Sequence, residues 1–252
     1  ALSMPPLAGS AWRFSIAVAL LLAWLRWERG GWPALSRRQW GGLALAGSVG
    51  VFAYSVFFML ALQRVEGSRA AVVVTTNPVF TTLLAAWLFK ERFNARIGLG
   101  LALAVTGAAT VLTHGAPWKV LAGEIGTGEW LLLGCIATWC AYTLLGRRLM
   151  TGIDALTATT ATAAVGGALL WASALAFEGP PRVLASIAAL PASGWVALVF
   201  LAVGATVLAY AWFNRGVAVL GAGAAASYIS LVPVFGVASS VLLLGEPLDA
   251  TL

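Results

Sequence analysis

Uncharged polar and aromatic side chains recur near the middle of long apolar segments, where they could bind a small molecule. Hydroxyl, amide and indole groups in hydrocarbon need hydrogen-bond partners, so we expect them to face the inside of a helical bundle. Phe58 is also a candidate binding residue, because it shares a helix face with Tyr54, which lies four residues earlier. The same groups would also suit hydrogen bonds between helices, and the sequence leaves both roles open. The candidate substrate-binding residues are Tyr54, Phe58, Asn77, Trp139, Tyr142, Tyr210, Tyr228 and Ser230.

Charged side chains are missing from the middle of these segments. Proton-coupled carriers often need a carboxylate or histidine there, so the coupling residues lie on further helices or transport runs downhill. An uncharged cavity best fits a substrate of zero net charge. We find no His-rich cluster, no Ser/His/Asp set and no paired acids, and therefore expect no catalytic residue, no metal site and no cofactor. Cys135 and Cys140 are five residues apart, do not share a helix face, and are expected to be core residues.

Two prolines inside apolar segments, Pro78 and Pro233, are candidate hinges. A proline inside a helix removes an N–H and clashes with the carbonyl four residues earlier, so each helix should kink there. A broken helix end could bind a zwitterion, whereas static kinks are also common in membrane helices, and both interpretations stay open. Glu91 and Glu246 end the same two segments, where they would form either a salt bridge that latches a gate or a simple interfacial charge.

Membrane-spanning helices must position these groups. Of the 252 residues, 61% are hydrophobic and 10% are charged, whereas a soluble domain carries about 25% charged residues. The net charge of +6 does not indicate nucleic-acid binding, because the positive residues gather at segment ends instead of forming a basic stripe. Apolar runs of about 20 residues predict spans at 6–27, 40–62, 69–89, 95–113, 129–149, 155–177, 194–214 and 221–244.

An internal repeat organises these spans. Pro78-Val79-Phe80 returns as Pro233-Val234-Phe235, a shift of 155 residues (233 − 78), and the same shift pairs Trp40 with Trp195, Phe58 with Phe213, and Glu91 with Glu246. The shift corresponds to five spans. Because five is odd, the two copies face opposite ways across the bilayer, and such an inverted repeat supports alternating access.

The register of the repeat predicts an all-α membrane protein of ten helices, of which this chain carries the second to the ninth. The first repeat would occupy 1–113 without its first helix, and a linker would occupy 114–128. The second repeat would occupy 129–252 without its last helix. The alternative is a genuine eight-helix protein.

The distribution of positive charge orients the chain. The loop at 26–39 carries four arginines and the loop at 90–96 carries one lysine and two arginines, while the opposite side carries fewer positive residues. The positive-inside rule therefore predicts that both loops are cytoplasmic, in a protein of the bacterial inner membrane.

These motifs resemble the EamA family of the drug/metabolite transporter superfamily. The resemblance rests on Pro5-Pro6 followed by Trp12-Arg13-Phe14 at the opening of one helix, and on the runs from Pro78 to Glu91 and from Pro233 to Glu246. It implies ten helices, a central cavity that opens alternately to each side, and no enzymatic activity. Within the family, the block from Trp40 to Glu91 and the mid-helix aromatics are most similar to the YddG-type aromatic amino-acid exporters.

The sequence thus predicts a secondary transporter that exports small zwitterionic metabolites, with aromatic amino acids the favoured class. The alternatives are export of a non-aromatic amino acid, a purine or a drug-like compound. A membrane enzyme and a non-transporting membrane subunit have less support. The expected partners are a small-molecule substrate and the lipid bilayer, with no nucleic acid, and the oligomeric state stays open.

Overall fold

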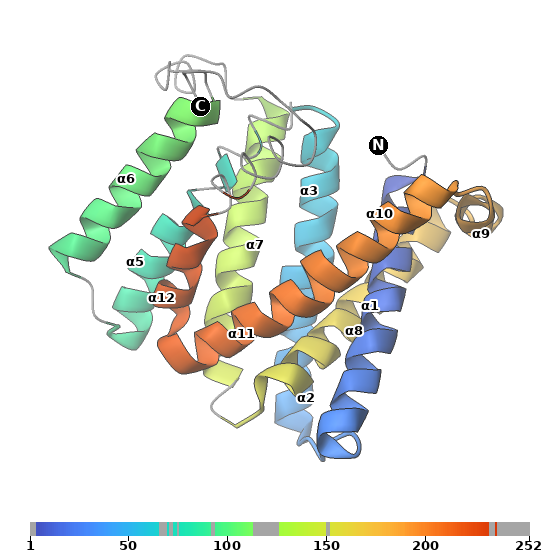
Figure 1. The fold of residues 1–252 in the computed structure, drawn as a ribbon, viewed down its shortest axis with the longest axis horizontal. Coiled ribbons are helices and arrows are strands. Elements are labelled where there is room, and N and C mark those ends of the chain that lie inside the picture. The colour runs from blue at the N-terminus through green and yellow to red at the C-terminus, as the bar shows by residue number, and fades with distance from the viewer. Residues whose placement is uncertain are drawn as a thin grey trace.

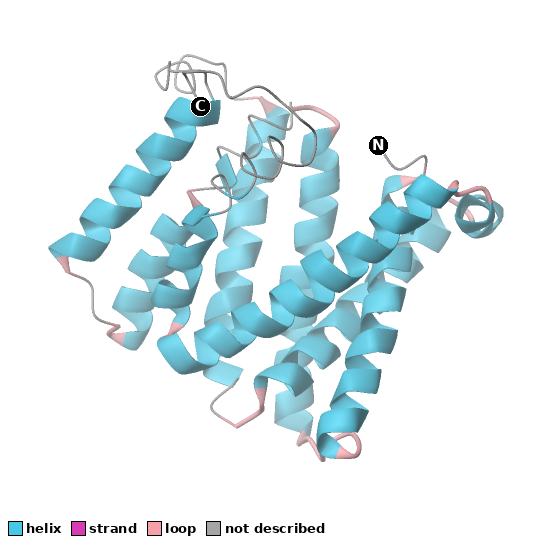
Figure 2. Ribbon diagram, in the orientation of Figure 1, coloured by secondary structure: helices cyan, strands magenta, loops and turns pink. Residues whose placement is uncertain are grey.

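Helices make up the regular structure of the described residues, which are 4–65, 70, 73–74, 76–91, 94–112, 126–149, 152–231 and 235 (Figure 2). In this computed structural model the helices lie side by side as a bundle (Figure 1). The elements are α1 (Pro6–Arg29), α2 (Arg37–Gly47), η1 (Ser48–Ala53), α3 (Tyr54–Leu62), α5 (Asn77–Phe89), α6 (Ala95–Leu112), α7 (Thr127–Leu149), α8 (Ala155–Phe177), α9 (Pro180–Ala188), α10 (Ala192–Ala202), η3 (Val203–Leu208), α11 (Ala209–Leu220), α12 (Ala222–Ser227) and η4 (Tyr228–Leu231).

Five continuous helical stretches of the described chain are long and apolar enough to cross a membrane, namely Pro6–Arg29, Arg37–Leu62, Trp130–Leu149, Ala155–Phe177 and Ala192–Leu220. Shorter apolar helices lie at Asn77–Phe89, Ala95–Gly107 and Ala222–Leu231. The predicted all-α membrane fold is therefore confirmed. One span is longer than predicted, since the helix predicted over 194–214 continues to Leu220, and the short helix α9 was not predicted at all.

The inverted repeat is visible in the backbone. Adding 155 to the bounds of α2 and η1 gives the bounds of α10 and η3 (37 + 155 = 192 and 48 + 155 = 203). Both η1 and η3 are π-helical, a conformation that is rare and usually confined to single turns. The α2–η1–α3 and α10–η3–α11 helices run in opposite directions through the bundle (Figure 1). Two copies of one bulged helix therefore cross the membrane in opposite senses.

The first proline breaks its segment instead of bending a continuous helix. Thr76 forms a turn, with its N–H bonded to the carbonyl of Val73 at 3.1 Å, and α5 begins at Asn77 with Pro78 in its first turn. A proline is tolerated there because a first-turn N–H has no partner within the helix. The expectation of a kink through Pro78 is thus replaced by a helix start, and Pro233 lies outside the described residues.

Side chains cap the N-termini of α1, α2 and α8. Helix α2 opens with a capping box, in which Ser36 accepts from the Gln39 N–H and Gln39 accepts from the Ser36 N–H. Asp154 caps α8 by accepting from the Thr157 N–H at 3.0 Å. Glu178, after α8, accepts from the N–H groups of Leu7 and Ala8 at 2.9 and 2.8 Å and so caps α1. These contacts fix where each helix enters the membrane.

Glycines allow α2 and η1 to pack closely against α8. A Cβ added to Gly47 would lie 2.6 Å from the carbonyl oxygen of Thr162, and one added to Gly166 would lie 2.3 Å from the side chain of Val51. Small residues let membrane helices approach in this way. Gly47 and Gly166 are therefore packing residues.

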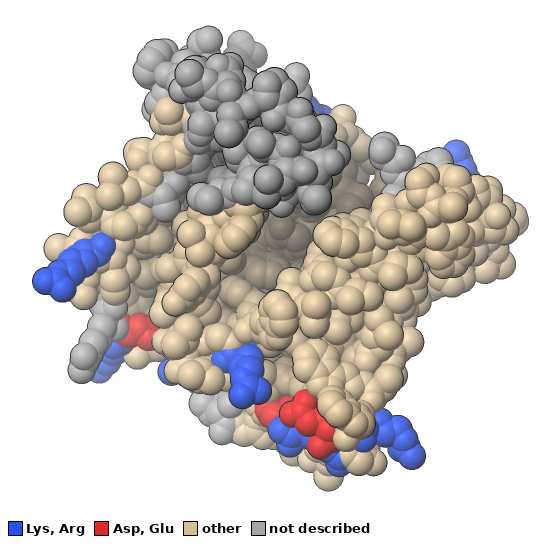
Figure 3. All heavy atoms as spheres, viewed as in Figure 1, with Lys and Arg blue, Asp and Glu red and all other residues tan. Residues whose placement is uncertain are grey.

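Charged side chains of the described residues gather along one edge of the bundle (Figure 3). Arg29 and Asp154 form a salt bridge at 3.5 Å there, which ties the end of α1 to the start of α8. The ends of α1 and α5 and the starts of α2 and α6 lie at this same edge (Figure 1). The loops at 26–39 and 90–96 thus share one side of the membrane, as the charge pattern predicted; that this side is cytoplasmic stays a prediction.

Candidate functional site

Trp139 stands at the centre of an aromatic cluster built from three long helices. Its ring centroid lies 5.4 Å from Tyr54, 5.7 Å from Tyr142, 5.6 Å from Tyr210 and 5.2 Å from Phe213. Tyr54 comes from α3, Trp139 and Tyr142 from α7, and Tyr210 and Phe213 from α11. Four of the predicted site residues therefore meet in the interior of the bundle. Phe213, expected to be the repeat partner of Phe58, joins them.

Two further rings extend the cluster. Phe58 stacks on Tyr54 with its centroid 5.9 Å away and the planes only 8° apart. Phe14 on α1 meets Tyr210 edge to face at 6.4 Å. The grouping of Phe58 with Tyr54 is as predicted, since residues four apart lie on one helix face. Aromatic rings thus form a continuous surface from α3 through α7 and α11 to α1.

A buried hydrogen-bond network supports one side of this surface. Asn214 on α11 donates to the hydroxyl of Tyr142 at 2.7 Å and to the Thr159 hydroxyl at 2.8 Å. The Tyr142 hydroxyl also lies 3.5 Å from that of Thr162 on α8. Tyr142 is 1% exposed, so its hydroxyl is committed to neighbouring helices and its ring backs Trp139 and Tyr210. Sequence reasoning missed Asn214 because the predicted span ended at that residue.

Asn77 belongs to a second polar group between α5 and α7. Its side-chain oxygen accepts from the Thr81 hydroxyl at 3.1 Å and from the Cys140 thiol at 3.3 Å. Thr81 and Cys140 are themselves 3.1 Å apart, and all three residues are buried. Cys140 directly follows Trp139, so this group adjoins the aromatic cluster. The sequence left two roles open for Asn77. The structure shows the interhelical hydrogen bond, and a role in substrate binding stays a prediction.

Arg13 corrects the prediction of an uncharged interior. It is the eighth residue of the 24-residue α1, about 10 Å along the helix at 1.5 Å per residue. Its guanidinium carbon lies 4.8 Å from the centre of the Phe14 ring. The prediction considered charged residues only at span midpoints, and Arg13 lies between the start and the midpoint of its helix.

Three buried polar atoms have no hydrogen-bond partner within the described part of the chain. They are Nε of Arg13, Nε1 of Trp139 and the hydroxyl oxygen of Ser230. Buried donors are paired in nearly all native structures, so unpaired ones point to a missing partner. Trp139 contacts Tyr54 and Tyr210, and Arg13 lies over Phe14, whose ring meets that of Tyr210, so both free donors border one connected set of rings.

Tyr228 is not part of this cluster in the described residues. It begins η4, and its side chain is 64% exposed. Ser230, in the same short helix, is half-buried. The sequence placed both at mid-depth, but the chain has already left the α-helix for a 3₁₀ turn at these positions.

Glu91 makes a well-defined contact at the charged edge. Its carboxylate accepts from the N–H groups of Ala222 and Gly223, both at 2.9 Å, and lies 3.6 Å from Nε of Arg147. One group thereby joins the end of α5 to the start of α12 and the end of α7 (Figure 1). Of the two roles that the sequence left open for Glu91, the structure shows the salt bridge, with Arg147 as its partner; that the bridge latches a gate stays a prediction. Glu246 lies outside the described residues.

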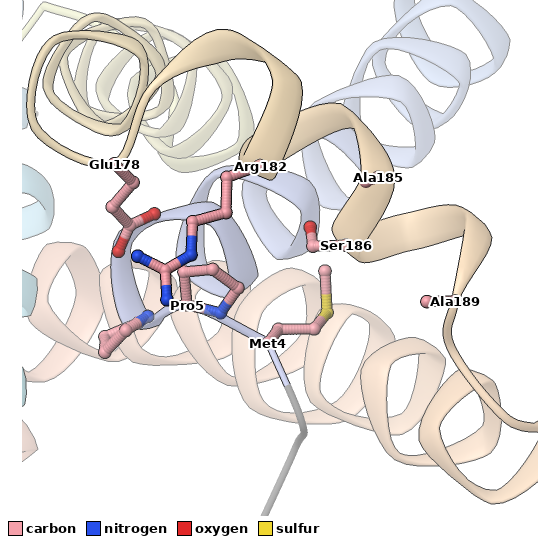
Figure 4. Close-up of a pocket in the computed structure, with 8 residues that line it drawn as sticks. Met4, Pro5, Glu178, Arg182, Ala185, Ser186 and Ala189 are labelled. Carbon is pink, nitrogen blue, oxygen red and sulfur yellow. The ribbon is translucent and has the colours of Figure 1, made fainter.

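Two open pockets lie at the ends of the bundle, away from the aromatic cluster. One, of about 530 Å³, is bordered by Pro5, Glu178 and Arg182 beside the start of α1 (Figure 4). The other, of about 390 Å³, is bordered by Arg29, Asp154 and Trp212 at the charged edge. Among the described residues no three of His, Cys, Asp and Glu come together as a metal site would require.

Known proteins match the chain along its length. An uncharacterized transporter of Bacillus subtilis, YyaM, is 29% identical over 91% of this chain and 74% of its own length. A probable amino-acid metabolite efflux pump of Salmonella typhimurium is 26% identical over 82% of this chain and 69% of its own. A crystal structure 20% identical in sequence superposes over 99% of this chain and 84% of its own with a TM-score of 0.78, which supports the fold.

The family model of the EamA-like transporters matches residues 1–113 and 126–252. These two matches cover both halves of the internal repeat, while the division at 114–128 stays a prediction. The chain is an integral membrane protein that belongs to the EamA-like transporter family.

Proposed function

We propose that the chain exports small zwitterionic metabolites, with aromatic amino acids as the preferred class, by alternating access through the bundle interior. The observation that carries this proposal is the Trp139 cluster, in which rings from α1, α3, α7 and α11 meet at mid-depth. A flat aromatic side chain stacks well against such rings, and each stacked pair is worth about 0.5–1.5 kcal/mol beyond burial.

The arrangement of the helices supports a transport role for this cluster. The cluster lies where the α2–η1–α3 helix and its inverted copy, α10–η3–α11, both contribute a wall. Sites at the interface of inverted repeats can open to either side as one repeat moves against the other. In Figure 3 the surface is hollowed between α12 and the α10–α11 helix.

The proposal includes transport without catalysis. Acids and bases of the described residues lie mainly at helix ends, where Glu91, Asp154 and Glu178 cap helices. The similarity to a probable amino-acid metabolite efflux pump supports the amino-acid class. Export, as opposed to uptake, is proposed from the similarity to this efflux pump.

Solute counterflow in proteoliposomes tests the substrate class. The panel contains phenylalanine, tyrosine and tryptophan, together with leucine, glutamate, a purine and a drug-like cation, with protein-free liposomes as the control. We expect the aromatic amino acids to exchange fastest. Faster exchange of leucine or the purine would replace the aromatic class by another metabolite, and absence of exchange for all solutes would refute the proposed function.

A further inference from the structure

Within the described residues, no Asp or Glu forms a salt bridge with Arg13. Arg29 and Arg147, by contrast, pair with carboxylates at helix ends. The guanidinium carbon of Arg13 lies over the ring of Phe14, 4.8 Å from its centre, and the Phe14 ring in turn meets that of Tyr210. A buried charge without a counter-ion is costly, and charged groups inside membrane spans usually mark a functional site.

The surroundings of Arg13 are those of a binding site. The ring contacts run without interruption from Phe14 to Tyr210, from Tyr210 to Trp139, and from Trp139 to Tyr54. The two unpaired donors, Nε of Arg13 and Nε1 of Trp139, belong to this same set. Two free N–H donors, one of them on a cation, fit a ligand that brings acceptor oxygens and one negative charge.

We propose that Arg13 binds the carboxylate of the transported molecule while Trp139, Tyr54 and Tyr210 hold its aromatic part. This inference rests on the proposed function and narrows it. A carboxylate suits the planar guanidinium, which can donate two parallel hydrogen bonds to it. A monocarboxylate fits better than a phosphate, because a dianion would need a second cation.

The site should select for the carboxylate more strongly than for the ammonium group. No carboxylate of the described residues lies in the cluster to pair with an ammonium, since the acids with recorded contacts cap helices or form salt bridges at their ends. An amino acid that loses its ammonium group should therefore still bind. One that loses its carboxylate charge should not.

Competition against phenylalanine counterflow measures this selectivity. The competitors are 3-phenylpropionate, which keeps the carboxylate, and phenylalanine amide, which keeps the ammonium. We expect 3-phenylpropionate to compete at least tenfold better than the amide. In Arg13→Gln this preference should vanish, and apparent affinity for phenylalanine should fall about thirtyfold, as when one partner of a buried charge pair is removed. Arg13→Lys should keep the preference with a weaker affinity.

Arg64→Gln is the matched control. Arg64 is exposed at the end of α3 and donates to the Leu60 carbonyl of its own helix, so its loss should change neither competitor. Equal competition by the amide, or an unchanged preference in Arg13→Gln, would overturn the assignment while leaving aromatic transport intact.

A binding measurement keeps the inference testable without transport. The purified protein should gain thermal stability with 3-phenylpropionate and not with phenylalanine amide, and Arg13→Gln should lose that gain. If no solute is transported but this pattern holds, the proposed function fails and the carboxylate site stands. If neither compound shifts the melting temperature of the wild-type protein, the carboxylate site is refuted.

Discussion

Removing the Glu91 carboxylate should loosen the charged edge of the bundle. Glu91 accepts two hydrogen bonds from the start of α12, at Ala222 and Gly223, and pairs with Arg147 on α7. Gly221 fits this contact in two ways. Its φ of 96° is a left-handed value that favours glycine, and a Cβ there would lie 2.6 Å from the Glu91 oxygen. We expect this contact to hold α5, α7 and α12 together whenever this side of the bundle is closed.

The size of the effect follows from the three interactions. A hydrogen bond to a charged group contributes about 1.5–3 kcal/mol, and the lower value applies because the Glu91 side chain is 19% exposed. The exposed ion pair with Arg147 adds about 0.5 kcal/mol. Glu91→Ala should thus remove about 3 kcal/mol from the closed contact, on the order of a hundredfold in its opening equilibrium. Glu91→Gln should have a smaller effect, because it keeps a neutral acceptor oxygen.

The two native thiols report where the bundle opens. Cys140 lies closer to Arg147 along α7 than Cys135 does, and both thiols are buried. In a Cys135→Ala background, Glu91→Ala should raise the rate at which a maleimide modifies Cys140 by up to about a hundredfold. In a Cys140→Ser background, the rate at Cys135 should change little.

The comparison separates a local opening from general destabilisation, since the latter would accelerate both thiols alike. Glu28→Ala, which removes an exposed carboxylate at the end of α1, is the control for charge alone. An unchanged Cys140 rate in Glu91→Ala would refute the role of this contact in closure.

Three further predictions test the cluster and the packing. Trp139→Ala should weaken the apparent affinity for phenylalanine about 2- to 13-fold, since each aromatic contact adds about 0.5–1.5 kcal/mol. Trp130 is 64% exposed near a helix end, so Trp130→Ala should leave the affinity unchanged. Equal effects of the two substitutions would make Trp139 a packing residue. Asn214→Leu should destabilise the protein by about 1–2 kcal/mol and lower its melting temperature, because the hydroxyls of Tyr142 and Thr159 each lose the hydrogen bond that Asn214 donates; an unaltered melting temperature would show that the network adds no stability. Gly166→Ala should destabilise the protein by about 1–3 kcal/mol in detergent unfolding, whereas Gly100→Ala, with open space around its added Cβ, should be neutral.

The membrane spans and the repeat were predictable because they depend on composition and spacing. A bilayer demands long apolar helices, so the runs in the sequence located them. The shift of 155 residues was fixed by Pro78-Val79-Phe80 and its copy. The π-helical turns of η1 and η3 are related by the same shift, but their residue types did not predict a π-helix. A π-helical turn depends on hydrogen-bond choices that tertiary packing decides.

The chemistry of the site was harder to predict, since a side chain's direction is set by packing. Depth along a helix selected Tyr54, Trp139 and Tyr210, whose rings do meet in the structure, but it passed over Arg13, which lies before the midpoint of α1. Asn214 was excluded for a different reason, because the apolar run ended there although the helix continues to Leu220. Asn214 is a polar residue that a hydropathy criterion treats as a span end, whereas Arg13 lay inside the predicted span but away from its midpoint.

The two repeats share a scaffold and differ in the side chains of the candidate site. At the shift of 155, Arg13 corresponds to Ala168 and Tyr54 to Ala209, while Tyr210 corresponds to Ser55 (13 + 155, 54 + 155 and 210 − 155). Alternating access needs helices that can exchange roles, and the matching π-helical turns supply them. Recognition of a molecule with one charged end needs asymmetry instead of symmetry, because a single cation must lie on one side of the cluster. Because Arg13 has no counterpart, the carboxylate should stay beside α1 in both states while the rings of α7 and α11 move around the aromatic part.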